Sequence, residues 1–81
     1  MELNLTALGE RMCIMDKRAE LINFIFKTQG AELKRLNPKE AAAELGCSDR
    51  TIRRLITELA DRKLIELRGN QLKLTDEILT A

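Results

Sequence analysis

Residues 37–59 read N-P-K-E-A-A-A-E-L-G-C-S-D-R-T-I-R-R-L-I-T-E-L, and this stretch decides the fold. Asn37 is a good N-cap for a helix, and Pro38 then stands at the first helical position, where its missing N–H costs nothing. Glu40 follows the cap by three residues and completes the pattern of a capping box. A helix is therefore expected to begin at Pro38.

Single residues also mark the end of this helix and the start of the next. Gly46 suits the left-handed conformation that ends a helix. Ser48 is an N-cap candidate for a second helix that runs to about Arg62. Only Gly46 and Cys47 then connect the two helices, so they must cross steeply. This arrangement is the helix-turn-helix unit.

The second helix has two different faces. Its apolar residues recur at helical spacing and form one stripe, made of Ile52, Leu55, Ile56 and Leu59. A second group falls largely outside that stripe and comprises Asp49, Arg50, Arg53, Arg54 and Thr57. Arginines near a helix N-terminus suit the major groove, because guanidinium groups pair with guanine edges and with phosphates. An ordinary solvated face is the alternative, and the capped helix and tight turn before it favour DNA.

Composition limits the possible partners. The chain has 81 residues, enough for one small domain, and 44% of them are hydrophobic, so it is expected to fold. The net charge of +1 gives no general affinity for nucleic acid. DNA binding must therefore come from local clustering, such as the three arginines against one aspartate in residues 48–54.

Other classes of function find little support. Cys13 and Cys47 have no histidine and no C-x-x-C motif beside them, so we expect reduced thiols in a cytoplasmic protein and no metal. No signal peptide and no membrane-spanning run is visible. With no phosphate-binding glycine loop and no activated nucleophile, we expect neither an enzyme nor a cofactor. Two phenylalanines without tyrosine or tryptophan provide no stacking platform for RNA.

Residues 4–29 show a long helical pattern. The residues at heptad a and d spacing are Leu5, Leu8, Met12, Met15, Ala19, Ile22, Phe26 and Gln29. Asp16 is a possible N-cap that divides the run, so a core helix is expected from Lys17 to about Gln29, where Gly30 stops it. That helix brings Leu21, Ile22, Ile25 and Phe26 against the helix-turn-helix. Residues 31–36 are interpreted as a connector.

The N-terminal part, residues 4–15, is expected to form its own helix. A helix of that length is marginal alone, so its stripe of Leu5, Leu8, Met12 and Met15 must be buried. It either forms a homodimer with a second subunit, which we slightly favour, or packs within its own chain.

After Arg62 the hydrophobic period changes from helical to two. Gly69-Asn70 fits a two-residue hairpin turn. In that register Leu67 faces Leu72 and Ile65 faces Leu74 on the inner side, while Glu66 faces Lys73 on the outer side. The core candidates of this region are Leu64, Ile65, Leu67, Leu72 and Leu74.

A hairpin directly after a helix-turn-helix is a wing. Arg68, Asn70 and Lys73 near its tip are placed to reach a DNA backbone, although the hairpin also serves to close the core. The tail from Thr75 to Ala81 is expected to form one frayed turn. The predicted divisions are residues 1–15, a winged helix-turn-helix domain over 16–75, and a tail over 76–81.

Residues 41–65 resemble the winged helix-turn-helix of bacterial transcription regulators, most closely the C-terminal DNA-binding domain of the Crp/Fnr family and next the DeoR-type repressors. The resemblance rests on Leu45-Gly46-Cys47-Ser48 followed by Thr51-Ile52 and Arg54. It implies a mainly α fold, a three-helix core with a β-hairpin wing, and an N-terminal helix ending near Asp16.

Carried over by position, the resemblance implies that Ser48 caps the recognition helix and contacts phosphate, and that Arg54 reads a base. Asp49, Arg50 and Arg53 differ from the best-known Crp pattern, so a different DNA site is expected. The family's nucleotide- or cofactor-binding β-roll is absent from this sequence, so the chain is expected to be either an excised domain or a naturally short regulator.

We therefore predict a sequence-specific double-stranded DNA-binding domain. Residues 49–57, including Thr51 and Thr57, enter the major groove. The backbone is held by Lys39, Ser48, Arg68 and Lys73. The alternative is a protein-interaction winged helix that uses the apolar stripe of residues 5–29.

Overall fold

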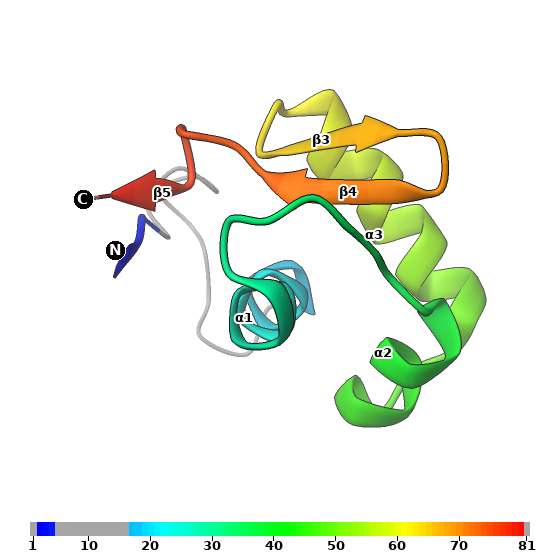
Figure 1. The fold of residues 1–81 in the computed structure, drawn as a ribbon. Coiled ribbons are helices and arrows are strands. Elements are labelled where there is room, and N and C mark those ends of the chain that lie inside the picture. The colour runs from blue at the N-terminus through cyan, green and yellow to red at the C-terminus, as the bar shows by residue number, and fades with distance from the viewer. Residues whose placement is uncertain (1, 5–16, 81) are drawn as a thin grey trace.

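The computed structural model describes residues 2–4 and 17–80 (Figure 1). The described residues form three helices and a three-stranded antiparallel sheet, together with a second, two-stranded pair. The elements are β1 (Glu2–Leu3), α1 (Lys17–Gln29), β2 (Lys34–Arg35), α2 (Pro38–Leu45), α3 (Asp49–Asp61), β3 (Ile65–Arg68), β4 (Gln71–Leu74) and β5 (Leu79–Thr80). The expectation of a mainly helical fold with a small hairpin is confirmed.

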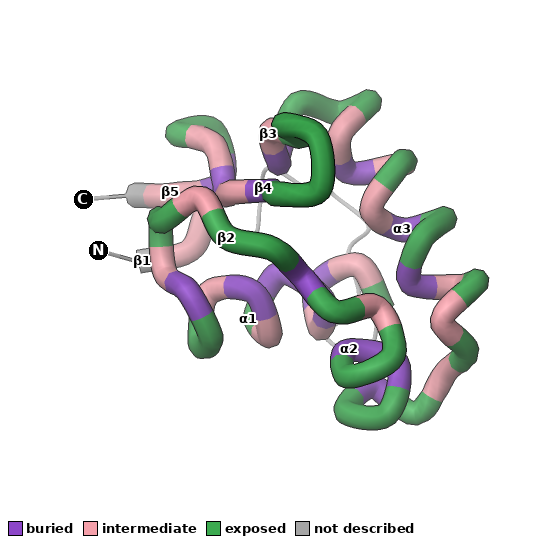
Figure 2. The backbone as a smooth tube through the Cα atoms, turned by 45° about the vertical axis from the view of Figure 1, so that its right-hand side comes forward, coloured by how far each residue is buried: buried purple, intermediate pink, exposed green. Residues whose placement is uncertain are grey.

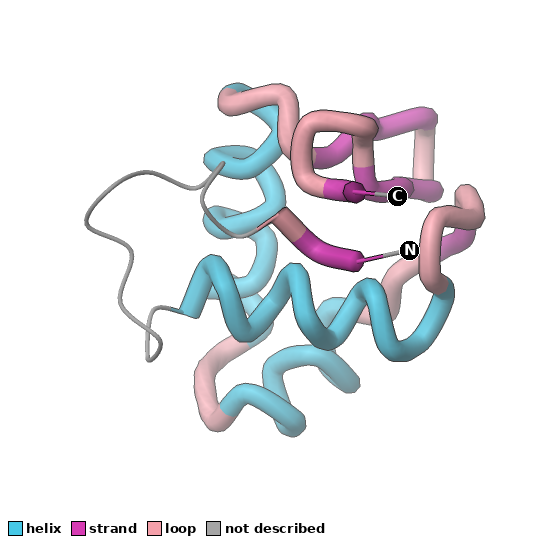
Figure 3. Tube along the Cα trace, turned by 90° about the vertical axis from the view of Figure 1, so that its left-hand side faces the viewer, coloured by secondary structure: helices cyan, strands magenta, loops and turns pink. Residues whose placement is uncertain are grey.

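α1 has the predicted bounds. Leu21, Ile22 and Ile25 are fully buried on its inner face, and Phe26 is half-buried against the same core. Gly30 follows the helix with φ +59°, the left-handed conformation that a glycine adopts without strain. In Figure 3, α3 runs across the direction of α1.

The predicted N-terminal helix falls mostly outside the described residues, as do Leu5, Leu8, Met12, Met15 and the proposed cap Asp16. Its first residue, Asn4, is not helical. Asn4 follows β1, and its backbone N–H donates to the carbonyl of Ile78 at 2.6 Å. The expected start of a helix at residue 4 is therefore wrong.

The predicted caps of α2 and α3 are confirmed. The Asn37 side chain accepts from the backbone N–H of Lys39 at 3.0 Å, and the Ser48 hydroxyl accepts from that of Thr51 at 3.2 Å. Gly46 has φ +69°, which lets the chain leave α2 and reach α3 within a few residues. The Asn37 cap takes the N–H of the second helical residue, and the described structure shows no bond between Asn37 and Glu40, so the predicted capping box does not form.

The sheet has the order β2-β4-β3, and β2 was not predicted. Lys34 pairs with Leu72 and Arg35 with Gln71, so part of the expected connector 31–36 is a strand. Two residues are too few to show a hydrophobic period. β2 exists because the free edge of β4 offers it backbone partners.

The hairpin register is confirmed, with Glu66 opposite Lys73 and Leu67 opposite Leu72. Gly69 has φ +61° in the two-residue turn. The expected burial of Leu67 is wrong, since this side chain remains 48% exposed. Its cross-strand neighbour Leu72 is buried, so the exposure is confined to the β3 side of this pair.

The C-terminal tail is part of the core rather than a frayed turn. Ile78 is fully buried, and β5 pairs with β1 at the other end of the chain. The hairpin leads into this segment through Thr75, whose N–H donates to the carbonyl of Leu64 at 3.0 Å. The predicted division at residue 75 therefore separates residues that share one core. The β1–β5 pair lies away from the hairpin turn (Figure 1).

Polar contacts also fix α2 and α3 relative to α1. The Lys17 ammonium donates to the carbonyl of Leu45 at 2.7 Å, at the end of α2. The Arg18 guanidinium lies 2.8 Å from the Glu58 carboxylate on α3. These contacts orient the outer face of α3.

Candidate nucleic-acid interface

The outer face of α3 carries three arginines. Ile52, Leu55 and Leu59 are buried on the inner face, which holds the helix against the core (Figure 2). Arg50, Arg53 and Arg54 are exposed on the other side together with Thr57. None of the three guanidinium groups has an ion-pair or hydrogen-bond partner among the described residues. All three charges are free to meet an anion.

The first turn of α3 is organised by its cap. The Ser48 hydroxyl lies 3.0 Å from that of Thr51, and it accepts the Thr51 backbone N–H. Asp49 is half-buried at the first helical position, where a carboxylate interacts favourably with the helix dipole. Thr51 is also half-buried. Of these three predicted contacts, Ser48 is the exposed one.

The predicted contacts of the hairpin are partly neutralised. Glu66 lies 3.1 Å from the Arg68 guanidinium and 3.7 Å from the Lys73 ammonium. Arg68 and Asn70 are exposed, whereas Lys73 is half-buried beside Glu66. The hairpin therefore presents less net positive charge than its sequence suggests.

Lys39 is exposed near the start of α2, so it lies at the N-terminal end of a different helix from the arginines. Its backbone N–H is used by the Asn37 cap. Its ammonium remains available to an anion, since it has no partner in the described structure.

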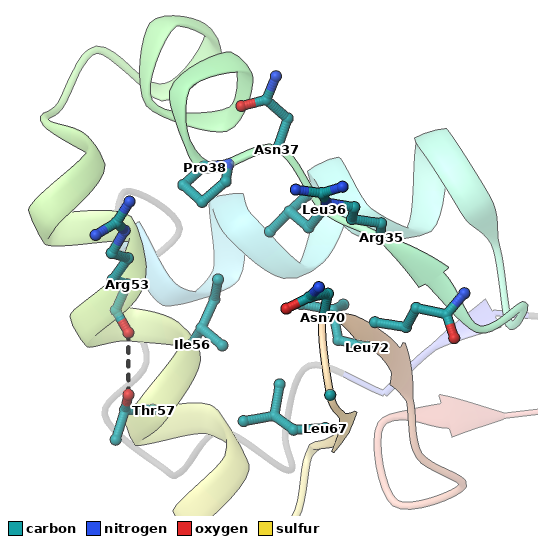
Figure 4. Close-up of a pocket in the computed structure, with 12 residues that line it drawn as sticks. Arg35, Leu36, Asn37, Pro38, Arg53, Ile56, Thr57, Leu67, Asn70 and Leu72 are labelled. Carbon is teal, nitrogen blue, oxygen red and sulfur yellow. Dashed lines mark hydrogen bonds between the residues drawn. The ribbon is translucent and has the colours of Figure 1, made fainter.

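A cleft of about 720 Å³ separates α3 from the tip of the hairpin. Figure 4 shows Arg53, Ile56 and Thr57 on the α3 side, with Leu67 and Asn70 opposite. The segment from β2 to the start of α2 closes one end and contributes Arg35, Leu36, Asn37 and Pro38. The cleft therefore brings together residues from five elements, β2, α2, α3, β3 and β4.

Sequence reasoning missed most of this cleft. Of the predicted site residues, only Arg53, Thr57 and Asn70 line it, whereas Arg54, Ser48 and Arg68 do not. Arg35 was assigned to a connector, and Leu67 to the core. Neither could be recognised from hydrophobic spacing, because each depends on what lies next to it in space.

Other kinds of site find no support in the described part of the chain. Residues 2–4 and 17–80 contain no group of histidine, cysteine or acidic side chains suited to a metal ion. No helix among these residues is long and apolar enough to cross a bilayer. Comparison of the chain with models of known families, with curated proteins and with solved structures gives no match.

Proposed function

We propose that this protein is a sequence-specific double-stranded DNA-binding domain of a bacterial-type transcriptional regulator, with a winged helix-turn-helix fold. The observation that carries the proposal is the outer face of α3, where Arg50, Arg53 and Arg54 are exposed and unpaired in the described structure. α3 serves as the recognition helix and lies in the major groove. The hairpin of β3 and β4 serves as the wing against the DNA backbone.

The arrangement of the helices supports this proposal. α2 and α3 are joined by three residues, 46–48, and the β3–β4 hairpin follows α3 after a short turn. The buried face of α3 fixes its direction, so the arginine face is presented as a rigid surface. A rigid helix is suited to base reading, because the side chains reach defined positions in the groove.

A dimer is part of the same proposal. The stripe of Leu5, Leu8, Met12 and Met15 would join two subunits, each binding one half of a two-fold symmetric site. The half-sites would then be about 34 Å apart, one turn of DNA.

The alternative was a protein-interaction module that uses the apolar stripe of residues 5–29. The C-terminal half of that stripe is occupied within the chain, because Ala19 and Ile22 are buried and Gln29 is buried as well. Only the stripe before residue 17 is left for such a partner, so we favour DNA.

The test is fluorescence anisotropy with a labelled random-sequence duplex. Affinity should fall steeply as salt is raised from about 50 to about 200 mM, because bound phosphates release counterions. The slope of log K against log salt then gives the number of phosphates contacted. Absence of binding at the lowest salt would contradict the proposal and direct attention to the N-terminal stripe. If binding is seen, selection from a random pool identifies the preferred site.

A further inference from the structure

The cleft between α3 and the hairpin is lined by basic residues without acidic ones, whereas the two kinds nearly balance over the whole chain. Twelve described residues line it; two are arginines and none is acidic. The full chain carries 13 acidic residues against 14 basic ones. Arg35 is exposed on β2, Arg53 is exposed on α3, and neither has an ion-pair partner in the described structure. The cleft is therefore suited to an anion.

The cleft also carries an apolar side chain on each of its two long sides. Ile56 is half-buried on α3, and Leu67 on β3 is the one large hydrophobic side chain among the described residues that remains clearly exposed. A cleft with two arginines and two apolar side chains matches a ligand with anionic groups joined by less polar units. The sugar–phosphate backbone of DNA has this chemistry.

The geometry of α3 separates Arg53 from Arg54. Consecutive helical residues are rotated by about 100°, so these two side chains leave α3 in different directions. Arg53, Ile56 and Thr57 share the side that lines the cleft, and Arg54 does not line it. Arg53, which was predicted to enter the major groove together with Arg54, therefore faces the cleft as well.

We propose that the cleft binds the sugar–phosphate backbone of one DNA strand, with Arg53 on the α3 side and Arg35 at the closed end as phosphate contacts, and with the sugars against Leu67 and Ile56. This inference rests on the proposed function and deepens it. Arg35 becomes a DNA contact on an element outside the helix pair and the hairpin. Arg53 becomes a residue for affinity, and Arg54 remains the residue for sequence.

The experiment compares Arg35→Gln, Arg53→Gln and the double variant with the wild type, on the selected site and on a random duplex. Each single change should lower the salt slope by about 0.9, and the double change by about twice that, because each removes one phosphate contact. The loss of binding affinity should be the same on the selected site and on the random duplex. Both side chains are exposed and unpaired, so circular dichroism and the thermal midpoint should stay at wild-type values.

Lys34→Gln is the matched control. Lys34 precedes Arg35 on β2, does not line this cleft, and is held 3.3 Å from Glu32. Its replacement should leave the slope unchanged. Unchanged slopes for Arg35→Gln and Arg53→Gln, with wild-type DNA binding intact, would overturn the inference and spare the proposed function. A loss for Arg53→Gln on the selected site alone would also overturn it, since Arg53 would then read bases.

Leu67→Ser tests the apolar contact of the hairpin side separately. This variant should bind both duplexes several-fold more weakly at every salt concentration. The salt slope should stay at the wild-type value, because no charge is removed. Wild-type affinity for this variant would overturn the placement of the sugars.

A fluorescent peptide of alternating glutamate and leucine tests the other anionic occupant. If the wild type binds this peptide but no duplex, and the double variant binds neither, the cleft takes an acidic protein segment. Both the inference and the proposed function would then be overturned.

Discussion

Arg54 lies on the outer face of α3, one turn before Glu58, and its guanidinium has no partner in the described structure. Glu58 is held by Arg18 from α1, so the backbone that carries Arg54 is well anchored. A guanidinium on a fixed helix is able to form two parallel hydrogen bonds to a guanine edge. Arg54 is therefore the residue we expect to set base preference.

Arg54→Ala should cost about 1–3 kcal/mol of binding free energy at the selected site. On a random duplex the loss should be much smaller, because the base contact contributes little there. Anisotropy titrations on both duplexes measure the difference, with Lys34→Ala as a control for loss of an exposed charge. Equal losses on both duplexes would remove Arg54 from base reading.

Gly46 connects α2 to α3 with φ +69° and ψ 38°. A Cβ at this position would meet no atom within 4 Å, so space is not the difficulty. The cost of a side chain comes from the left-handed backbone alone. Gly46→Ala should lower the free energy of unfolding by about 1–2 kcal/mol.

Urea denaturation of Gly46→Ala measures this cost. Gly46→Asn is the matched variant and should lose less, because asparagine tolerates the left-handed region better than alanine. An alanine variant as stable as the wild type would show that the turn adopts another conformation.

At the scale of elements, Gln29 joins the end of α1 to the sheet. Its side chain is buried, and its amide donates to the carbonyl of Leu72 on β4 at 2.8 Å and to that of Glu32 at 2.7 Å. The sequence pattern placed Gln29 as the one polar member of an apolar stripe. A polar residue is needed here because its amide donates to these two carbonyl groups, and an apolar side chain could not do so.

Gln29→Ala should lower the free energy of unfolding by about 1–3 kcal/mol, because two hydrogen bonds are lost and a buried carbonyl loses a donor. Thr28→Ala is the control on the same helix. Thr28 is exposed, and its hydroxyl bonds only to carbonyls of its own helix, Phe24 and Ile25. If both variants unfold at the same urea concentration, the link between α1 and β4 contributes nothing.

For the whole molecule, Ile78 brings the end of the chain into the core. It is fully buried, its carbonyl accepts from Asn4, and β5 then pairs with β1. The two ends of the described chain are thus held by the same core that supports α3. A change in the tail should therefore affect the stability of the whole fold.

Ile78→Ala should lower the free energy of unfolding by about 2–5 kcal/mol, the usual cost of a large-to-small change at a buried position. Such a loss is a large share of the stability of a small domain. Glu77→Ala is the control, since Glu77 is exposed beside it. A stable Ile78→Ala variant in thermal unfolding would show that the tail is dispensable.

The local features of this fold were predictable from the sequence by itself. The caps at Asn37 and Ser48, the left-handed Gly46 and the hairpin turn at Gly69 depend on residues a few positions apart. Their conformations are set by short-range hydrogen bonds and backbone sterics, which the sequence records directly. The starts of α2 and α3 follow from the same signals, and Gly30 marks the end of α1.

Tertiary structure alone decided the rest. β2 forms because β4 presents a free edge, Ile78 is buried because the core reaches the tail, and Leu67 is exposed because no element covers it. The same holds for the cleft, where Arg35 and Arg53 come together from distant parts of the chain. Hydrophobic spacing tells which side of a strand or helix is apolar, but what lies against that side depends on contacts between residues far apart in sequence.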